Sequence, residues 1–211
     1  MSKLGSRLGT ITNLVVIGVA LVYAFQPGGV VDKARERLGT RRLAQAAWSD
    51  LVTSAEGSIG RSTGPAVVVF SEYTCTHCKV VFDEAVEMAS ARADFSLAYH
   101  LMVGEEGSFS WEAAALATCA SKEGRFEQAS TALFELGREA TASSTLDRDR
   151  LAVSLGLDPV ALGECVEAET TRATLRKEQE WAVRLNVVGV PTFVTPRGMR
   201  VGRVPLRSLA N

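Results

Sequence analysis

The chain has 211 residues, enough for one domain of ordinary size and an accessory segment. Its 23 lysines and arginines nearly balance its 24 aspartates and glutamates, which excludes binding of nucleic acid or membranes through bulk positive charge. Hydrophobic residues make up 46 % of the chain, enough for a packed core, and four cysteines are too few for a disulfide-dense scaffold.

The N-terminus carries a long uncharged segment, because no charged residue occurs from Leu8 to Val31. As a helix this span would reach about 36 Å, which covers a hydrocarbon core of about 30 Å. A secretory signal peptide is the alternative, with Lys3 and Arg7 as its basic start and Val22-Tyr23-Ala24 as its cleavage site. We expect residues 1–28 to form a membrane anchor or a signal peptide, and we favour the anchor.

Residues 29–56 are expected to form a juxtamembrane helix followed by a linker. Apolar residues recur at helical spacing from Val31 to Leu51, and Ser54 to Gly64 is rich in serine and glycine. Two basic residues precede the apolar segment and five follow it, namely Lys33, Arg35, Arg37, Arg41 and Arg42. The positive-inside rule alone would therefore place the rest of the chain in the cytoplasm. The cysteine chemistry described below favours the opposite side of the membrane, and we give it more weight.

Four segments of the remaining chain are typical of strands. Residues 66–70 form a short run of mostly β-branched and aromatic residues, typical of a buried central strand. Residues 95–103 alternate between apolar and polar side chains. A hairpin is expected near the C-terminus, from strands at residues 190–194 and 199–201 that a Pro-Arg-Gly turn separates.

Apolar residues recur at helical spacing in four other segments, which are therefore predicted to be helices: residues 76–91, 111–120, 126–136 and 170–185. Ser110 is expected to cap the second of these helices. Asp147 and Asp158-Pro159 mark the starts of two more, because aspartate caps helices well and proline fits the first helical position. The order of elements predicts an α/β domain over residues 57–211, with a helical insertion at about 108–170 in one crossover.

The chemistry of the chain is concentrated in Cys75-Thr76-His77-Cys78, at the first turn from strand to helix. Free N–H groups and the positive end of the helix dipole favour a thiolate at Cys75. His77, when protonated, would stabilise that thiolate further. Cys78 lies one turn into the helix and can close a disulfide. The pattern is typical of thiol–disulfide exchange, with Cys75 as the nucleophile and Cys78 as the resolving thiol.

Other uses of a C-x-x-C pair fit this chain less well. Zinc would need a second pair of ligands, but Cys119 and Cys165 are not spaced as one and the only other histidine is His100. Covalent haem needs a histidine directly after the second cysteine, where this chain has Lys79. A purely structural disulfide remains open. We expect no metal and no cofactor.

Two segments, Phe70 to Lys79 and Val187 to Phe193, resemble the DsbA-like thiol–disulfide oxidoreductases of the thioredoxin superfamily. Histidine in the third place of the motif and valine before the proline are both as in DsbA. The resemblance covers about residues 57–211 and implies a thioredoxin-like fold, here preceded by an N-terminal transmembrane helix. It also implies that Pro191 is cis and faces the two thiols. Val190 would offer its backbone to an extended client strand, with Thr76 beside it in the substrate-binding site.

The chain departs from that family at positions that matter for the chemistry. Thr76 stands where DsbA has proline, so the reduction potential of the Cys75–Cys78 pair does not follow from the resemblance. Val69 stands six residues before Cys75, where thioredoxin and DsbA have a buried acid. Glu72 is the nearest carboxylate. It is a candidate proton relay, although a solvated loop carboxylate is the interpretation that we favour.

The other two cysteines, Cys119 and Cys165, lie 46 residues apart on separate predicted helices. A structural disulfide, as in some DsbA relatives, and two buried free thiols both fit, and we favour the disulfide. Trp111 and Trp181 are expected in the core. His100 is expected to be a strand residue with no special role.

These observations predict a membrane-tethered thiol–disulfide oxidoreductase whose catalytic domain faces the periplasm or the cell exterior. It would form disulfides in client proteins that have free thiols, and a membrane redox partner would reset the Cys75–Cys78 disulfide. A reductase or isomerase of the same fold is the nearest alternative. A redox-inactive or copper-carrying thiol module is a second alternative, but no methionine lies near Cys75 in the sequence to support it.

Overall fold

The computed structural model describes residues 20, 24, 30–60, 67–141 and 144–209. The anchor or signal peptide expected at residues 1–28 therefore lies, apart from residues 20 and 24, outside the described part. Within the described ranges, no helix is long and apolar enough to cross a membrane. The chain divides into two compact units, Met1–Arg42 and Leu43–Asn211. The second unit contains the sheet and all four cysteines.

Helix α2 (Val30–Thr53) occupies the segment in which the sequence predicts a helix over residues 31–52. The part of α2 that belongs to the second unit buries Ala44, Ala47 and Leu51, which follow one another at helical spacing. These side chains pack in one cluster with Phe70 and Trp181, so the end of α2 contributes to the core of the second unit.

Five strands form one mixed sheet with the order β1-β3-β2-β4-β5. Strands β2 (Val67–Ser71) and β3 (Ser96–Leu101) pair in parallel, while β4 (Thr192–Thr195) pairs antiparallel with both β2 and β5 (Gly198–Val201). Every residue of β2 is buried, which agrees with its uniformly apolar sequence up to Ser71. The predicted strands are all present, and the C-terminal pair forms the expected hairpin.

Strand β1 (Gly57–Gly60) corrects the expectation of a linker or entry loop from Ser54 to Gly64. Its four residues pair antiparallel with β3, and Ile59 is fully buried. Gly60 has a φ of +100°, and a Cβ there would lie 2.1 Å from the carbonyl oxygen of Phe95. Residues 57–60 therefore form a strand because they pair with β3, which is distant in sequence. Glycine is needed at position 60 because the two backbones approach closely there.

The helices that follow the first strand-to-helix turn are α3 (Thr76–Ala91), α4 (Phe109–Lys122), α5 (Phe126–Gly137), α6 (Arg148–Ser154), α7 (Pro159–Glu167) and α8 (Glu169–Arg184). The helical insertion is present and consists of α4 to α7, between β3 and α8. A short 3-10 turn, η1 (Leu206–Ser208), lies near the C-terminus.

Capping residues predict the starts of three of these helices, and two of the predictions are confirmed. Asp147 and Asp158 accept backbone N–H groups at the starts of α6 and α7. The cap of α4 is Ser108, which accepts a hydrogen bond from the backbone N–H of Trp111, and not Ser110. Helix α4 begins earlier than predicted because Phe109, which the predicted helix excludes, is buried in the core and extends the apolar face.

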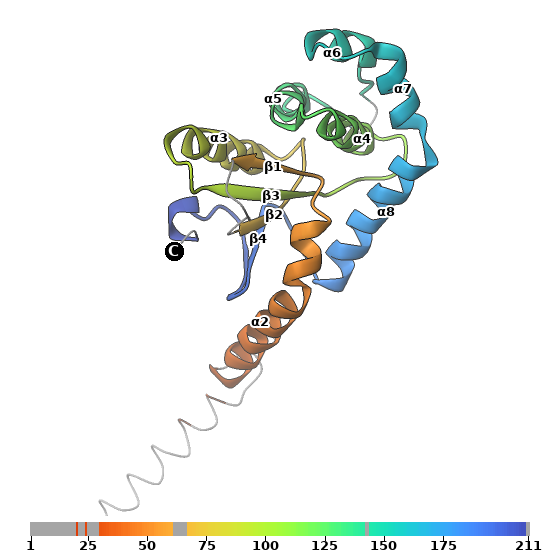
Figure 1. The fold of residues 1–211 in the computed structure, drawn as a ribbon. Helices are drawn as coiled ribbons and strands as arrows, with labels where there is room; N and C mark the ends of the chain where they lie inside the picture. The colour runs from red at the N-terminus through yellow and green to blue at the C-terminus, as the bar shows by residue number, and fades with distance from the viewer. Residues whose placement is uncertain (1–19, 21–23, 25–29, 61–66, 142–143, 210–211) are drawn as a thin grey trace, which may run out of the picture. The chain divides into compact units, whose positions relative to one another are not determined.

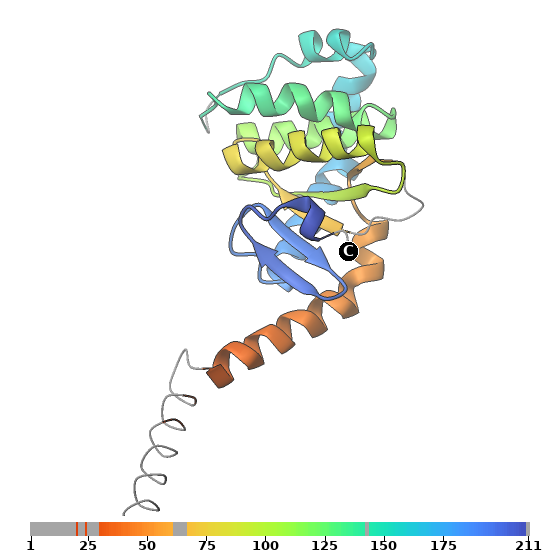
Figure 2. The same cartoon turned by 90° about the vertical axis from the view of Figure 1, so that its left-hand side faces the viewer.

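Different helices cover the two faces of the sheet, as Figures 1 and 2 show, and each face buries its own cluster of side chains. Helices α3, α4 and α5 cover one face, where Val67 and Val69 of β2 pack in the larger cluster. The end of α2 and helix α8 cover the other face, where Val68 and Phe70 pack with Trp181. The alternation along β2 therefore sends odd-numbered residues toward α3, which carries the resolving cysteine. Both tryptophans expected in the core, Trp111 and Trp181, are buried.

His100 has a structural role that the sequence did not indicate. Its ring is fully buried, with Nδ1 2.9 Å from Oε2 of Glu178 and Nε2 2.9 Å from the carbonyl oxygen of Leu51. The same Glu178 oxygen accepts the backbone N–H of Leu101 at 2.8 Å. Burial disfavours a charged His100, but hydrogen bonding and charge from Glu178 outweigh it and raise the pKa of the imidazole. The pair joins β3, α8 and the end of α2.

Candidate active site

The turn between β2 and α3 places Cys75 at the N-cap of the helix. The backbone N–H of Cys78 donates both to Cys75 Sγ at 3.2 Å and to the Cys75 carbonyl at 3.0 Å, so a donor of the first helical turn points at this sulfur. Cys75 is half-buried and Cys78 is fully buried, and the two thiols are free. Cys75 is therefore the sulfur that an incoming thiol or disulfide can reach, with a backbone donor in place to stabilise its thiolate.

The second wall of the site comes from the loop before β4. The peptide bond from Val190 to Pro191 is cis, and the Cys75 thiol donates to the Val190 carbonyl oxygen at 3.8 Å. The backbone N–H of Gly202 donates to the Pro191 carbonyl at 2.8 Å, which ties the loop to the segment after β5. Residues 115 positions apart in sequence thus meet at the reactive sulfur.

A groove of about 430 Å³ lies beside Cys75, between this loop and the loop after β3. Its walls are mostly apolar, and Val188 in particular is 77 % exposed. The lining includes Val190, Val103, Met102 and the carboxylate residue Glu72. Binding of an extended client segment by the Val190 backbone stays a prediction. The predicted substrate-binding residue Thr76 is exposed at the first position of α3 and does not line the groove.

His77 also lies on the first turn of α3, and its side chain is exposed. It is placed between the two cysteines in sequence but on the solvent side of the helix, whereas Cys78 points into the core. Stabilisation of the Cys75 thiolate by a protonated His77 stays a prediction.

The resolving thiol Cys78 lies in a strongly apolar environment. Burial raises its pKa well above the ordinary value, and the neighbouring Cys75 raises it further. A backbone hydrogen bond from Glu72 and the Ser71 hydroxyl act in the opposite direction. The pair is therefore asymmetric: Cys78 is held as a neutral thiol in the reduced protein, while Cys75 is the accessible sulfur.

Glu72 is not the solvated loop carboxylate that the sequence favoured. It is half-buried, and its carboxylate accepts hydrogen bonds from the backbone N–H of Thr74 at 2.9 Å and from the Ser110 hydroxyl at 2.8 Å. The Thr74 hydroxyl donates to its other oxygen. These contacts hold the residue directly before Cys75 and connect it to α4. The geometry favours a positioning role for Glu72 over proton relay.

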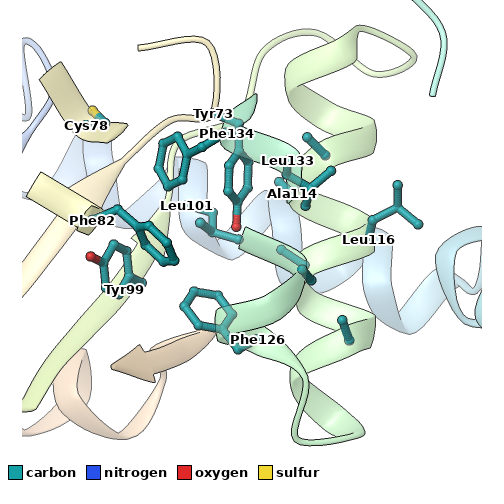
Figure 3. Close-up of a cluster of buried hydrophobic side chains, with 14 of the residues drawn as sticks. Tyr73, Cys78, Phe82, Tyr99, Leu101, Ala114, Leu116, Phe126, Leu133 and Phe134 are labelled. Carbon is teal, nitrogen blue, oxygen red and sulfur yellow. The ribbon is translucent and has the colours of Figure 1, made fainter. Parts of the chain in front are cut away.

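Tyr73 fixes the same loop from the core side, a role that the sequence pattern does not predict. Its hydroxyl is 2.9 Å from the Ser130 hydroxyl of α5, and its ring lies 4.8 Å from that of Phe134. Figure 3 shows Tyr73 pointing into the cluster that also contains Phe134, Phe82 and Cys78. Burial raises the pKa of Tyr73, so its phenol is neutral. The only sequence signal was an aromatic residue close to a reactive cysteine.

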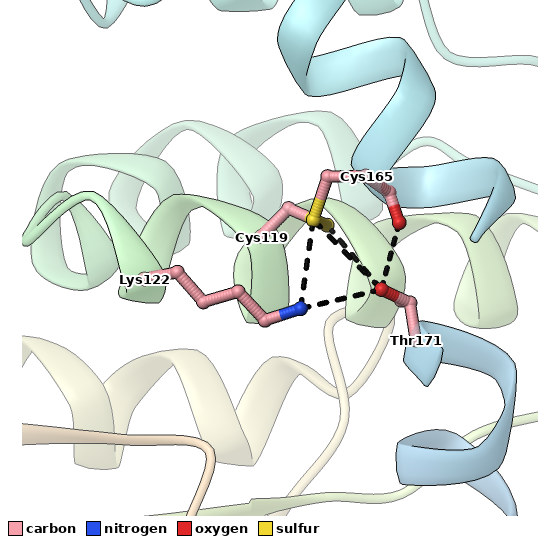
Figure 4. The surroundings of a disulfide bond; sticks show 4 residues. All are labelled: Cys119, Lys122, Cys165 and Thr171. Carbon is pink, nitrogen blue, oxygen red and sulfur yellow. Dashed lines mark hydrogen bonds between the residues drawn. A yellow bond between two sulfur atoms is a disulfide. The ribbon is translucent and has the colours of Figure 1, made fainter. Parts of the chain in front are cut away.

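Cys119 and Cys165 form a disulfide with a sulfur–sulfur distance of 2.08 Å, which joins α4 to α7 inside the insertion. Figure 4 shows the Thr171 hydroxyl beside both sulfurs, donating to the Cys165 carbonyl at 2.7 Å. The Lys122 ammonium lies 3.6 Å from Cys165 Sγ. The two cysteines are thus bonded to each other and stand apart from the Cys75–Cys78 motif in sequence and in secondary structure.

The described residues contain no group of three or more histidine, cysteine, aspartate or glutamate side chains that could hold a metal ion. The site consists of two thiols, a helix N-terminus and a proline loop, and its chemistry is that of sulfur.

Comparison with known proteins identifies a family for this arrangement. The thioredoxin family model matches residues 53–196, about two thirds of the chain. No match was found among curated proteins.

Solved structures of similar fold include three bacterial proteins. The thiol–disulfide exchange protein α-DsbA2 from Wolbachia pipientis has a TM-score of 0.67 at 15 % identity, over 83 % of this chain and 94 % of that one. The catalytic domain of Proteus mirabilis ScsC has a TM-score of 0.61 at 18 % identity, over 81 % and 96 %. A thioredoxin-like oxidoreductase from Silicibacter pomeroyi has a TM-score of 0.56 at 25 % identity, over 68 % and 82 %.

Proposed function

The chain belongs to the thioredoxin family, and we propose that it is a thiol–disulfide oxidoreductase of the DsbA and ScsC type that works in the oxidising direction. In this role the Cys75–Cys78 disulfide is transferred to client proteins that have free thiols. The observation that carries the proposal is the position of Cys75. It caps α3, accepts the Cys78 backbone N–H at 3.2 Å and lies beside the cis-Val190–Pro191 loop.

The reaction follows from the asymmetry of the two sulfurs. A client thiolate attacks Cys75 Sγ of the oxidised enzyme, the bond to Cys78 breaks, and its electron pair stays on Cys78 as a thiolate. A mixed disulfide now joins the client to Cys75. A second client thiolate attacks the client sulfur of that bond, which forms the client disulfide and releases Cys75 as a thiolate. The enzyme leaves with two thiols, so an oxidant must restore its disulfide.

The oxidising direction is supported by what stabilises the reduced form. A thiolate at Cys75 is favoured by the N–H group of Cys78 and by the N-terminus of a 16-residue helix. A disulfide becomes a stronger oxidant as its reduced form becomes more stable, since the free energy of reduction is then more favourable.

We further propose that the domain lies outside the cytoplasm, tethered by residues 1–28, and that a membrane redox partner reoxidises it. The Cys119–Cys165 disulfide supports this location, because structural disulfides persist in oxidising compartments and are rare in the cytosol. A C-terminal alkaline phosphatase fusion, which is active only outside the cytoplasm, tests the topology. An inactive but well-expressed fusion would overturn the location and leave the chemistry untouched.

The activity is tested with the purified full-length chain and a fluorescent peptide that contains two cysteines. The oxidised wild type should form the peptide disulfide, and Cys75→Ser should abolish this. Cys78→Ser cannot form the Cys75–Cys78 disulfide and should likewise leave the peptide reduced. Peptide oxidation that survives in Cys75→Ser would contradict the assignment of the nucleophile.

A further inference from the structure

The buried thiol Cys78 must carry a negative charge at one point in every thiol–disulfide exchange at this site. When a client thiolate breaks the Cys75–Cys78 bond, the electron pair remains on Cys78 Sγ, whose side chain is fully buried. A charge in an apolar environment is costly unless a hydrogen-bond donor faces it. The surrounding core is apolar, with Val81 and Phe82 of α3 in the same cluster. The structure should therefore contain a donor for this sulfur.

Ser71 is a side chain that fits this requirement. It ends β2, is 1 % exposed, and its Oγ makes no hydrogen bond of normal geometry within the described residues. An unpaired buried hydroxyl destabilises a protein, so a serine at this position calls for a compensating role.

The direction of the Ser71 side chain follows from the alternation of β2. Val67 and Val69 pack in the cluster under α3, whereas Val68 and Phe70 pack on the opposite face. Ser71 therefore faces α3, the helix from which Cys78 points down into the same cluster. The Ser71 hydroxyl lowers the pKa of Cys78, against the larger effect of burial, which raises it.

The backbone of Ser71 is held by the segment that follows β3. The backbone N–H of Met102 donates to the Ser71 carbonyl at 2.7 Å, which extends the pairing with β3. A backbone hydrogen bond from Glu72 also lowers the pKa of Cys78. Val69, six residues before Cys75, is buried and apolar, so no carboxylate lies at that position to assist.

We propose that Ser71 is a catalytic residue whose hydroxyl donates a hydrogen bond to Cys78 Sγ while the Cys75–Cys78 bond breaks or forms. No proton needs to be transferred: the hydroxyl rotates toward the sulfur as charge develops, and the thiolate later takes a proton from water. The proposal rests on thiol–disulfide exchange at this pair, but not on its direction, since oxidation and reduction pass through the same charged Cys78.

The test measures two rates separately. One is the cleavage of the Cys75–Cys78 bond, which leaves a thiolate on Cys78, and the other is the reaction of the Cys75 thiol. Oxidised full-length protein is mixed with dithiothreitol, quenched with acid at intervals, and the Cys75–Cys78 disulfide is followed by peptide mass spectrometry. Ser71→Ala should slow its cleavage about tenfold, which corresponds to about 1.4 kcal/mol in the barrier. In the Cys78→Ser background, iodoacetamide should alkylate Cys75 at the same rate whether or not Ser71→Ala is also present.

Thr118 provides a matched control, because its hydroxyl is also buried without a partner in the described structure. Thr118→Val should leave the cleavage rate within about twofold of the wild type, a difference of less than about 0.5 kcal/mol in the barrier. Ser71→Thr, which keeps a hydroxyl, should restore most of the rate that Ser71→Ala loses. Ser71→Gly removes the same hydroxyl and replaces the alanine variant if that one folds poorly.

Two results would overturn the role of Ser71. One is cleavage in Ser71→Ala and Ser71→Gly at the wild-type rate. The other is an equal fall in disulfide cleavage and in Cys75 alkylation, which would indicate a general disturbance of the loop. If the wild type itself exchanged no disulfide with dithiothreitol or peptide, the proposed function would fail instead, so the two failures are distinguishable.

Discussion

The Ser110 hydroxyl, on the first turn of α4, donates a hydrogen bond of 2.8 Å to the carboxylate of Glu72, three residues before Cys75. This contact joins the helical insertion to the loop that carries the nucleophile. Glu72 in turn accepts the backbone N–H of Thr74 at 2.9 Å. The insertion therefore helps to position the reactive sulfur, in addition to forming part of the core.

Removal of this contact should be measurable without loss of the fold. Ser110→Ala leaves a carboxylate with one partner fewer and should lower the free energy of unfolding by about 1–2 kcal/mol, because the acceptor is charged but only half-buried. Urea denaturation measures the difference. Ser90→Ala serves as the control, since Ser90 on α3 bonds only the Val86 carbonyl of its own helix. Equal stability of the two variants would show that the Ser110–Glu72 contact contributes nothing.

Gly137 should be intolerant of any side chain. It ends α5, and a Cβ there would lie 2.1 Å from the carbonyl oxygen of Tyr73, a backbone atom of the loop before Cys75. Gly137→Ala must displace that loop and should destabilise the protein by about 1–3 kcal/mol, with slower alkylation of Cys75.

The matched variant is Gly163→Ala in α7, where a Cβ meets nothing within 4 Å. It should stabilise the protein by about 0.5–1 kcal/mol, because alanine is the better helix former. Thermal unfolding of both variants tests the contrast. Destabilisation by Gly163→Ala as large as that by Gly137→Ala would contradict the close approach at Tyr73.

The disulfide between Cys119 and Cys165 should stabilise the insertion without taking part in catalysis. Replacement of both cysteines by alanine opens a loop of 46 residues and should cost about 4 kcal/mol in the chain-entropy model, or roughly 10 °C in melting temperature. Peptide oxidation by Cys75 should persist at a temperature below the lowered transition. A double variant that stays stable but loses peptide oxidation would show that this disulfide belongs to the redox cycle.

Glu56 should make the protein less stable as the pH rises. Burial, with a smaller contribution from the charge of Glu178, raises its pKa from 4.5 to about 7 in the folded chain. The folded state therefore binds an extra proton between these values, and stability is lost as the pH increases from about 4.5 through about 7. Glu56→Gln should match the wild type near pH 4.5 and be more stable than the wild type at pH 8.

Melting temperatures of Glu56→Gln and the wild type across this range test the effect. The difference in melting temperature between the two proteins is the informative quantity. His100 and Glu178 also have raised pKa values, so they make both proteins less stable as the pH rises. Glu87→Gln, on the exposed side of α3, controls for the loss of one negative charge. A difference that does not grow with pH would contradict the burial of Glu56.

The sequence predicts the parts of the fold that depend on local pattern. The apolar run of β2, the helical period of α3 and the C-x-x-C motif between them are contiguous, so the reactive cysteines could be placed before the structure was known. The strand state of β1 could not, because two of its four residues are glycine and pairing with β3 sets its conformation. Glu178, the partner of His100, lies 78 residues away in sequence, so no local pattern could predict the pair.

The loop that contains Val190 and Pro191 could also be predicted only in part from the local sequence. A glycine, a valine and a proline before a strand are visible in the sequence, but the cis bond and the approach of Val190 to Cys75 followed only from resemblance to a family. Ser71 was hidden because serine at the end of a strand is unremarkable. Only its burial without a hydrogen-bond partner, on the face toward Cys78, indicates a role.

The reduction potential of the Cys75–Cys78 pair tests the central proposal most directly. The full-length chain is equilibrated in glutathione redox buffers, and the fraction of the pair that is oxidised is measured by alkylation and mass spectrometry. An oxidase should give a potential well above that of thioredoxin, in the range from about −180 to about −120 mV typical of protein disulfide isomerase and DsbA. A value at or below about −270 mV, the potential of thioredoxin, would contradict the oxidising direction and identify the protein as a reductase.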